Sequence, residues 1–289
     1  MQKIATAEGT KEILNKYPFI FQKKFGQNFL IDSHVLTKII ASANITNEDY
    51  VIEIGPGIGS VTQALLETAQ KVIAVEIDNQ LIPILKEQFK DYDNFLLIHN
   101  DIMKMDLREL IKHECQNKKV KVVANLPYYI TTPIIMMLLE EELPIDSITV
   151  MVQKEVAQRL ASIPGTKQYG AITVAVNYYA DTYLVANVPR NCFMPRPNVD
   201  SAVIKLTIKD NQDFMVYNKK QMFQIVKAAF LQRRKTLLNT LYEHGALDLD
   251  KETLKKLLDE SKIGSSIRGE TLSLEEFARL SNYIDDNRP

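Results

Sequence analysis

The 289-residue sequence contains only two cysteines, four histidines and no tryptophan. Cys115 and Cys192 form no CxxC pair, so we expect neither a disulfide framework nor a zinc site, and the scattered histidines predict no metal site. No apolar run approaches the roughly 18 residues that cross a membrane, and the first residues lack an apolar signal core. We therefore expect a globular protein of the reducing cytoplasm.

The sequence also lacks an excess of charge of either sign, because its net charge is −1. Any binding of nucleic acid must therefore come from local patches. Basic residues without an acidic neighbour occupy residues 13–31 and 214–242. A solvated helix face is the alternative explanation for either stretch. The residues that we expect to contact RNA are Lys23, Lys24, Arg233, Arg234 and Lys235.

Short apolar strands alternate with helical stretches in the first half of the sequence, which is typical of a parallel sheet covered by helices. The predicted strands are 51–54, 71–76, 95–99, 120–124 and 147–152. The predicted helices are a short one from residue 10, then 33–44, 59–68, 81–89, 107–113 and 132–141.

The pattern changes toward the carboxyl end. Residues 171–179, 183–188 and 202–208 have strand-like patterns, and the last two are candidates for antiparallel pairing at the far edge of the sheet. Helices are predicted at 221–231, 234–242, 251–258 and 274–284. The fold class is therefore α/β, with a Rossmann-like domain at 1–209 and a small all-helical domain at 210–289 that we expect to bind RNA.

A glycine cluster and two acidic residues follow the first three predicted strands. Gly55 begins a GxGxG pattern that ends the first strand, and glycine lets the backbone turn sharply and lets a ligand approach it. Glu76 closes the second strand, where a carboxylate can accept from two ribose hydroxyls. Asp101 follows the third strand and can accept from an adenine amino group. A tight strand-to-helix turn would explain the glycines alone, but together the three positions predict a nucleoside-type cofactor.

The segment Asn125-Leu126-Pro127-Tyr128 follows the fourth strand at the same edge. The lone pair of an adenine amino group is delocalised into the ring, so the group is a poor nucleophile. The side-chain oxygen of Asn125 and the backbone carbonyl of Leu126 can accept its two N–H bonds and turn the lone pair toward a methyl donor. Pro127 stiffens the loop, and Tyr128 offers a ring on which a base can stack. A proline turn with a packed tyrosine is the structural alternative.

A proline-rich segment, Phe193-Met-Pro-Arg-Pro-Asn-Val-Asp-Ser, confines its chain to extended conformations. This confinement can fix Phe193 as a second stacking surface for the base. An equally good interpretation is that Phe193 anchors the loop in the core.

Five motifs in this order resemble the ribosomal RNA adenine N6,N6-dimethyltransferases, most closely the branch that modifies 16S RNA. They are KFGQNFL from Lys24, EIGPGIG from Glu53, NLPY from Asn125, FxPxPxVDS from Phe193 and AFxxRRKTL from Ala229. The resemblance implies a methyltransferase domain that binds S-adenosylmethionine and modifies two adjacent adenines near the 3′ end of 16S RNA in the 30S particle. Independently of the resemblance, nothing in the sequence demands more than a monomer, so we expect the chain to act as one.

The resemblance also implies roles for individual residues. Tyr128 and Phe193 would sandwich the target adenine, and Asn125 would bridge base and cofactor. The implied cofactor contacts are Asn28, Leu30, Gly55, Glu76, Asp101 and Asn125.

Three other functions fit part of the pattern. A methyltransferase of 23S RNA would share the fold and the NLPY loop, but the helical tail with Arg233 and Arg234 favours the 16S branch. A non-catalytic ribosome assembly factor would not need the intact NLPY segment and acid pair. A dehydrogenase would use GxGxxG spacing in place of the GxGxG seen here.

Overall fold

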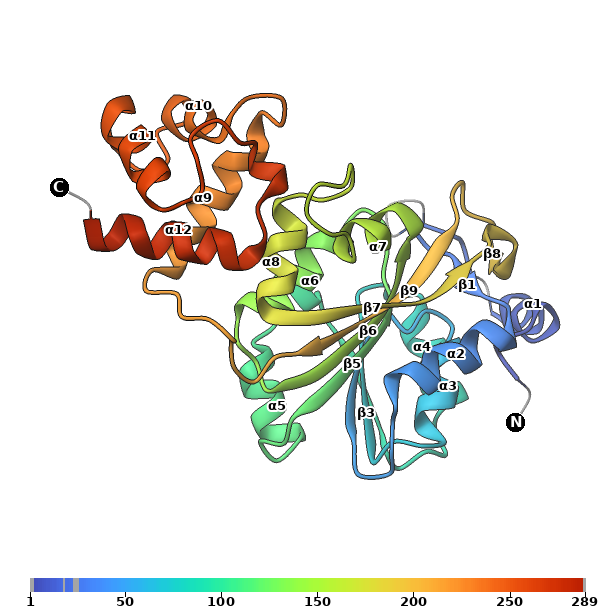
Figure 1. The fold of residues 1–289 in the computed structure, drawn as a ribbon. Coiled ribbons are helices and arrows are strands. Elements are labelled where there is room, and N and C mark those ends of the chain that lie inside the picture. The colour runs from blue at the N-terminus through green and yellow to red at the C-terminus, as the bar shows by residue number, and fades with distance from the viewer. Residues whose placement is uncertain (1–2, 18, 23–25, 288–289) are drawn as a thin grey trace. The chain divides into compact units, whose positions relative to one another are not determined.

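The computed structural model describes residues 3–17, 19–22 and 26–287, which form two compact units (Figure 1). The first unit comprises Met1–Ala157 and Thr182–Ile208, and the second comprises Gln158–Asp181 and Lys209–Pro289. The segment 158–181 therefore groups with the helical unit, although the sequence-based boundary placed it in the Rossmann-like range. The cause is local packing of this segment against the C-terminal helices, described below.

The first unit is built on a seven-stranded sheet in the order β4-β3-β2-β5-β6-β9-β7. Parallel pairing joins its first five strands, as the alternating pattern predicted. These strands are β2 (Tyr50–Ile54), β3 (Lys71–Glu76), β4 (Phe95–His99), β5 (Val120–Asn125) and β6 (Ile145–Gln153). Because the chain continues to β3 on one side of β2 while β5 lies on its other side, the strand order reverses at β2, which is where such sheets bind ligands.

Two later strands extend the sheet. β9 (Ser201–Ile208) pairs antiparallel with β6, from Ser147 opposite Thr207 to Gln153 opposite Ser201, and β7 (Ala180–Val188) forms the edge. The expected antiparallel addition at the far edge is thus confirmed. A separate two-stranded ladder, β1 (Phe29–Leu30) with β8 (Phe193–Met194), was not predicted, because two-residue strands carry no periodic signal.

Helices cover both faces of this sheet (Figure 1). On one side lie α2 (Ser33–Ala43) and α3 (Ser60–Leu66), and on the other lie α5 (Leu107–Glu114) and α6 (Thr131–Glu140). α1 (Ala7–Lys16), α4 (Leu81–Gln88), the 3₁₀ turns η2 (Ile102–Lys104) and η3 (Arg190–Cys192), and α7 (Lys154–Leu160) complete the first part of the chain.

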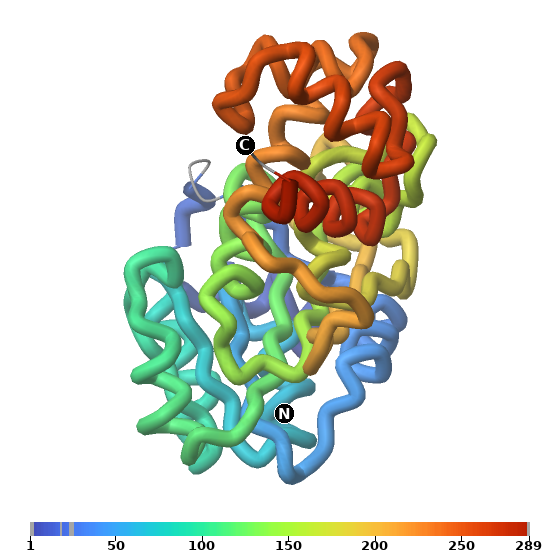
Figure 2. The backbone as a smooth tube through the Cα atoms, turned by 60° about the vertical axis from the view of Figure 1, so that its left-hand side comes forward, coloured from blue at the N-terminus to red at the C-terminus, as the bar shows by residue number. Residues whose placement is uncertain are grey.

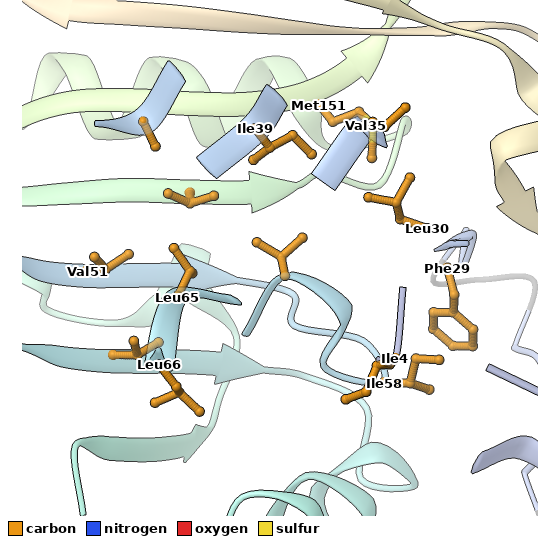
Figure 3. Packing of buried hydrophobic residues seen from close by; sticks show 14 of the residues in the cluster. Ile4, Phe29, Leu30, Val35, Ile39, Val51, Ile58, Leu65, Leu66 and Met151 are labelled. Atoms are coloured by element: carbon orange, nitrogen blue, oxygen red, sulfur yellow. The ribbon is translucent and has the colours of Figure 1, made fainter. Parts of the chain in front are cut away.

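The core beside α2 and α3 explains why these segments are helical. Val35 and Ile39 project from one face of α2 and lie beside Met151 of β6, in an apolar core that also includes Leu65 of α3 (Figure 3). The helix starts at Asp32, whose Oδ1 accepts from the backbone N–H groups of residues 34 and 35. This apolar face holds the segment before α2 against the sheet, and that segment forms one wall of the site described below.

The second unit is a cluster of helices (Figure 2). It contains α8 (Ala171–Tyr179), α9 (Lys219–Leu231), α10 (Leu237–Glu243), α11 (Lys251–Glu260), η4 (Gly269–Thr271) and α12 (Leu274–Asn287). A shared apolar core includes Val174 of α8, Ile225 of α9 and Phe277 of α12.

One predicted element was wrong, and another begins later than predicted. Residues 171–179 form α8 and not a strand: Thr173 Oγ1 accepts from the Gly170 N–H at the helix start, and Val174 packs into the helical core. Burial here overrides the strand preference of the β-branched residues. The helix expected from residue 234 begins only at Leu237, because Thr236 caps it. Residues 233–235 therefore lie in a turn.

Across the residues that the structure describes, no helix is long and apolar enough to cross a membrane.

Candidate cofactor and substrate site

A cleft lies at the carboxyl ends of β2, β3, β4 and β5 in the first unit. Its atom-free space is about 1050 Å³, counting the part open to solvent. The structure brings nine of the predicted site residues to its walls, from five separate segments. They are Asn28, Leu30, Gly55, Glu76, Asp101, Asn125, Leu126, Pro127 and Tyr128.

The glycine turn after β2 leaves room for a ligand. Gly55 has a φ of +68°, and a Cβ added there would meet nothing within 4 Å. The next two glycines are instead close to aromatic rings: a Cβ on Gly57 would lie 3.1 Å from Phe29, and one on Gly59 would lie 2.5 Å from Phe89. The first glycine therefore opens the backbone to the cleft, while the other two allow close packing beneath it.

Two acidic residues lie at the ends of the next strands, as predicted. Glu76 is 5% exposed, and its Oε1 accepts from the N–H groups of Ile77 and Asp78, both at 2.8 Å. Burial raises the pKa of Glu76 to about 7, although these backbone hydrogen bonds oppose the rise. Asp101 lines the cleft beyond β4, with one oxygen accepting from the Met103 N–H at 3.1 Å and the other 3.6 Å from Lys104.

Asp78 was missed by the sequence analysis, and it ties the N-terminal segment to the end of β3. Its buried carboxylate accepts from the side-chain amides of Gln27, at 2.6 Å, and Gln22, at 3.1 Å. This tether places Asn28 and Leu30 on the cleft wall. In the sequence, the one indication of this tether was the glutamine of the KFGQNFL motif, but a motif does not show which residue its side chain binds. Lys23 and Lys24 lie outside the described residues.

The side chain of Asn125 is held at the end of β5 by the same N-terminal segment. Its Nδ2 donates to the backbone carbonyl of Asn28 at 3.0 Å. The amide oxygen consequently faces away from Asn28, and it accepts no hydrogen bond from another described residue. The amide oxygen of Asn125 is therefore a fixed hydrogen-bond acceptor with no described partner, at the position where the sequence predicted an acceptor.

The loop that follows is rigid for local reasons. The Leu126 N–H donates to Met151 at 3.1 Å, and the Pro127 carbonyl accepts from Ile130 at 3.2 Å and from Thr131 Oγ1 at 3.0 Å. Tyr128 is half-buried, and its hydroxyl lies 2.7 Å from the Oγ of Ser201. Burial raises the pKa of Tyr128, and the hydroxyl of Ser201 opposes this effect. The ring is thus fixed at both ends on the cleft wall.

Phe193 does not reach the cleft. It is 3% exposed and belongs to the apolar core with Leu30, its partner in the β1–β8 ladder. Of the two interpretations of this residue, the structure supports the core anchor over the stacking surface. The proline-rich motif contributes to the site through Ser201 instead.

Glu53, the first residue of the EIGPGIG motif, is a second residue to which the sequence analysis gave no role. It is 2% exposed, lines the cleft and has an Oε2 atom with no hydrogen-bond partner. Burial raises the pKa of Glu53 to about 8; Thr62 opposes the rise, and the nearby Glu76 carboxyl adds to it. Its position before Gly55 was visible in the sequence, but its burial was not.

The basic residues of the second unit differ from one another. Arg233 is bound to the protein itself: its guanidinium pairs with Glu270 at 2.7–2.8 Å and donates to the carbonyls of Lys167 and Thr166 at 2.6 and 3.2 Å. Lys235 pairs with Glu243 at 2.6 Å. Arg234 is exposed and makes no ion pair with a described residue.

Comparison with known proteins agrees with this geometry. Residues 19–286 match the family described as Ribosomal RNA adenine dimethylase. The chain is 56% identical to Ribosomal RNA small subunit methyltransferase A of Lachnoclostridium phytofermentans, over 99% of both chains. It is 52% identical to the protein of that name in Clostridioides difficile, over 99% of this chain and 98% of the relative.

Solved structures show the same fold. A dimethyladenosine transferase from Plasmodium falciparum superposes with a TM-score of 0.78 at 26% identity, covering 89% of this chain and 98% of that one. The 23S rRNA methyltransferase ErmE superposes with a TM-score of 0.69 at 24% identity, covering 89% of this chain and all of the other. The second likeness concerns the fold alone.

Proposed function

Because the chain belongs to the ribosomal RNA adenine dimethylase family, we propose that it methylates N6 of two adjacent adenosines near the 3′ end of 16S RNA in the 30S particle. The methyl donor is S-adenosylmethionine and the product is N6,N6-dimethyladenosine. The names of relatives at 49–56% identity support the small subunit over the 23S alternative. The activity serves small-subunit biogenesis; we further propose that the chain acts as a cytoplasmic monomer.

The observation that carries this proposal is the hydrogen bond from Asn125 Nδ2 to the Asn28 carbonyl. This bond occupies the amide nitrogen of Asn125, so its amide oxygen is left to accept a hydrogen bond from a substrate. An exocyclic amino group has two N–H donors, so its binding site needs acceptors. The backbone carbonyl of Leu126, which no described residue uses, is a second acceptor one residue away. The pair suits an adenine amino group.

This arrangement can make a poor nucleophile reactive. When both N–H bonds point at acceptors, the nitrogen lone pair turns out of the plane of the base. S-adenosylmethionine supplies, when bound, an electrophilic methyl group. Rigid placement of acceptor and nucleophile is the main catalytic contribution of this loop, and it needs no strong general base.

The cofactor residues fit an adenosine compound. The open backbone at Gly55 leaves room for it, and Asp101, which lines the cleft, would accept from its adenine amino group. Glu76 uses Oε1 for two short backbone hydrogen bonds and Oε2 for only one, at 3.4 Å from Gly57, so Oε2 remains the better placed to accept from a ribose hydroxyl. Asn28 and Leu30 close the wall that also positions Asn125.

Binding of the RNA is assigned to two regions. Tyr128 offers a fixed ring on which the extruded adenine can stack, and such stacking contributes roughly 1–3 kcal/mol per base. In the second unit, Arg234 is the residue of its triplet that is free to contact phosphate. Lys23 and Lys24 remain predicted contacts.

The test is methyl transfer from labelled S-adenosylmethionine to 30S particles isolated from cells that lack this activity, followed by nuclease digestion. We expect label in N6,N6-dimethyladenosine from 16S RNA. Particles that already carry the modification are the control, and they should accept no label. Absence of label in unmodified particles, with cofactor binding intact, would contradict the proposed substrate.

A further inference from the structure

The charged side chains that line the cleft are all acidic. Among the described residues of its walls, the carboxylic acids are Glu53, Glu76 and Asp101, and no lysine, arginine or histidine lines it. A cleft of this kind favours a cationic ligand over a neutral one of the same shape. The two cofactor forms differ in this respect, because S-adenosylmethionine carries a positive sulfonium and its product S-adenosylhomocysteine carries a neutral thioether.

Glu53 differs from the other two acids in having an unused oxygen atom. Glu76 is held by three backbone N–H groups, and Asp101 is bonded to the Met103 N–H and lies near Lys104. Glu53 Oε2 is buried without a partner at the end of β2. An unpaired buried carboxylate is costly, so such a group is usually protonated or awaits a ligand.

Among the residues that the structure describes, no cation lines the cleft beside this carboxyl group. From β3 it faces Glu76, with Asp78 just beyond, and Asp101 lies after β4. α3 contributes the uncharged Thr62, and β5 contributes the uncharged Asn125. Burial and this acidic neighbourhood raise the pKa of Glu53 to about 8, so the ligand-free protein holds a proton there at neutral pH.

We propose that Glu53 determines the preference of the cleft for the cationic cofactor over its neutral product, by releasing its proton to solvent when S-adenosylmethionine binds. After the methyl group leaves, the sulfur is neutral and the carboxylate takes a proton back from solvent. The site then has no electrostatic attraction for the S-adenosylhomocysteine that it holds, which favours release of this product. This inference rests on the proposed use of S-adenosylmethionine.

Isothermal titration calorimetry of the full chain at pH 7, in two buffers of different ionisation enthalpy, measures both affinity and protons released. We expect S-adenosylmethionine to release more protons than S-adenosylhomocysteine. In Glu53→Gln, the affinity ratio of the two compounds should fall by about tenfold, because one buried charge is lost. Sinefungin, which carries an ammonium group in place of the sulfonium, should behave like S-adenosylmethionine.

Glu67→Gln is the matched control, because Glu67 is exposed at the end of α3 and lies outside the cleft. It should leave the ratio and the proton count unchanged. A purely structural role of Glu53 would weaken both compounds equally, and an unchanged ratio in Glu53→Gln would overturn the inference. If neither compound binds the unmodified protein, the proposed cofactor itself is wrong.

A second measurement needs no variant, in case Glu53→Gln does not fold. In the unmodified protein, the affinity ratio should rise severalfold between pH 6 and pH 7.5, because proton release becomes easier as pH rises toward the pKa of Glu53. A ratio that does not change over this range would also overturn the inference.

Discussion

The cleft of the first unit and the turn between α9 and α10 of the second unit both gather polar side chains, but they use them in opposite ways. In the cleft, Asn125 and Glu53 each keep one oxygen free of protein partners. In the turn, Arg233 and Lys235 form ion pairs with Glu270 and Glu243, whereas Arg234 makes no ion pair with a described residue. The paired groups of the turn stabilise the fold, whereas the unpaired oxygens of the cleft are available to a ligand.

The largest effect that tests this comparison is expected at Asn125. Replacing Asn125 by alanine removes the fixed acceptor, so kcat should fall on the order of 10²–10³-fold while the fold is retained. Single-turnover methyl transfer to 30S particles measures the rate, and circular dichroism checks the fold. Asn15→Ala, at an exposed position of α1, is the control and should retain full activity. Turnover close to normal in Asn125→Ala would refute the assignment.

The second effect concerns stability and pH. Glu53 has a pKa of about 8 in the folded protein against about 4.5 ordinarily, so the folded state keeps a proton that the unfolded chain loses across this interval. The resulting stabilisation is complete below pH 4.5 and is lost as pH rises to 8. Glu76, with a pKa of about 7, adds to the loss below pH 7.

Urea unfolding of the ligand-free chain should therefore show a lower free energy of unfolding at pH 8.5 than at pH 6.5, by at most about 1.4 kcal/mol per pH unit for each group. Glu53→Gln should flatten this dependence, and Glu67→Gln should preserve it. Equal stability of the unmodified chain at both pH values would show that the carboxyl of Glu53 is ionised throughout.

The third test separates two neighbours in the basic turn. Arg233→Ala breaks the bonds to Glu270 and to the 166–167 backbone, so we expect a loss of about 1–2 kcal/mol of stability, visible as a lower Tm. Arg234→Ala should leave Tm unchanged, weaken binding to 30S particles severalfold and make its salt dependence shallower by about one unit of slope.

Arg234→Lys, which keeps the charge, should restore most of the binding to 30S particles. If Arg234→Ala lowers Tm as much as Arg233→Ala does, or leaves the salt dependence unchanged, the distinction between the two arginines is wrong.

The same contrast explains how far sequence alone could go. Gly55, Glu76, Asp101 and Asn125 each lie at or just after the end of a strand. The carboxyl ends of neighbouring parallel strands meet at one edge of the sheet, so strand prediction alone brought these residues together. The resemblance added Asn28 and Leu30, which the structure also brings to the cleft. The parallel sheet was predictable for a similar reason, since alternating strands and helices permit few arrangements.

What escaped prediction depends on contacts between distant segments. The tie from Gln27 to Asp78 spans 51 residues and has no periodic pattern. The partners of Arg233 lie 37 and 66–67 residues away, so a basic triplet could not reveal that one member is structural. The β-branched run in α8 suggested a strand because its burial among helices is a property of the whole unit.

The smallest effect on activity is expected from removing the hydroxyl of Tyr128. In this residue, paired and unpaired groups occur within one side chain. Its hydroxyl is paired with Ser201, while its ring lies on the cleft wall. Tyr128→Phe removes one hydrogen bond and should cost about 1 kcal/mol of stability while kcat changes less than about threefold, because the stacking surface remains. Thermal unfolding and methyl transfer measure the two quantities. Tyr183→Phe, at a residue that is 68% exposed and does not line the cleft, should change neither. A loss of activity in Tyr128→Phe as large as in Asn125→Ala would mean that the hydroxyl, and not the ring, acts on the substrate.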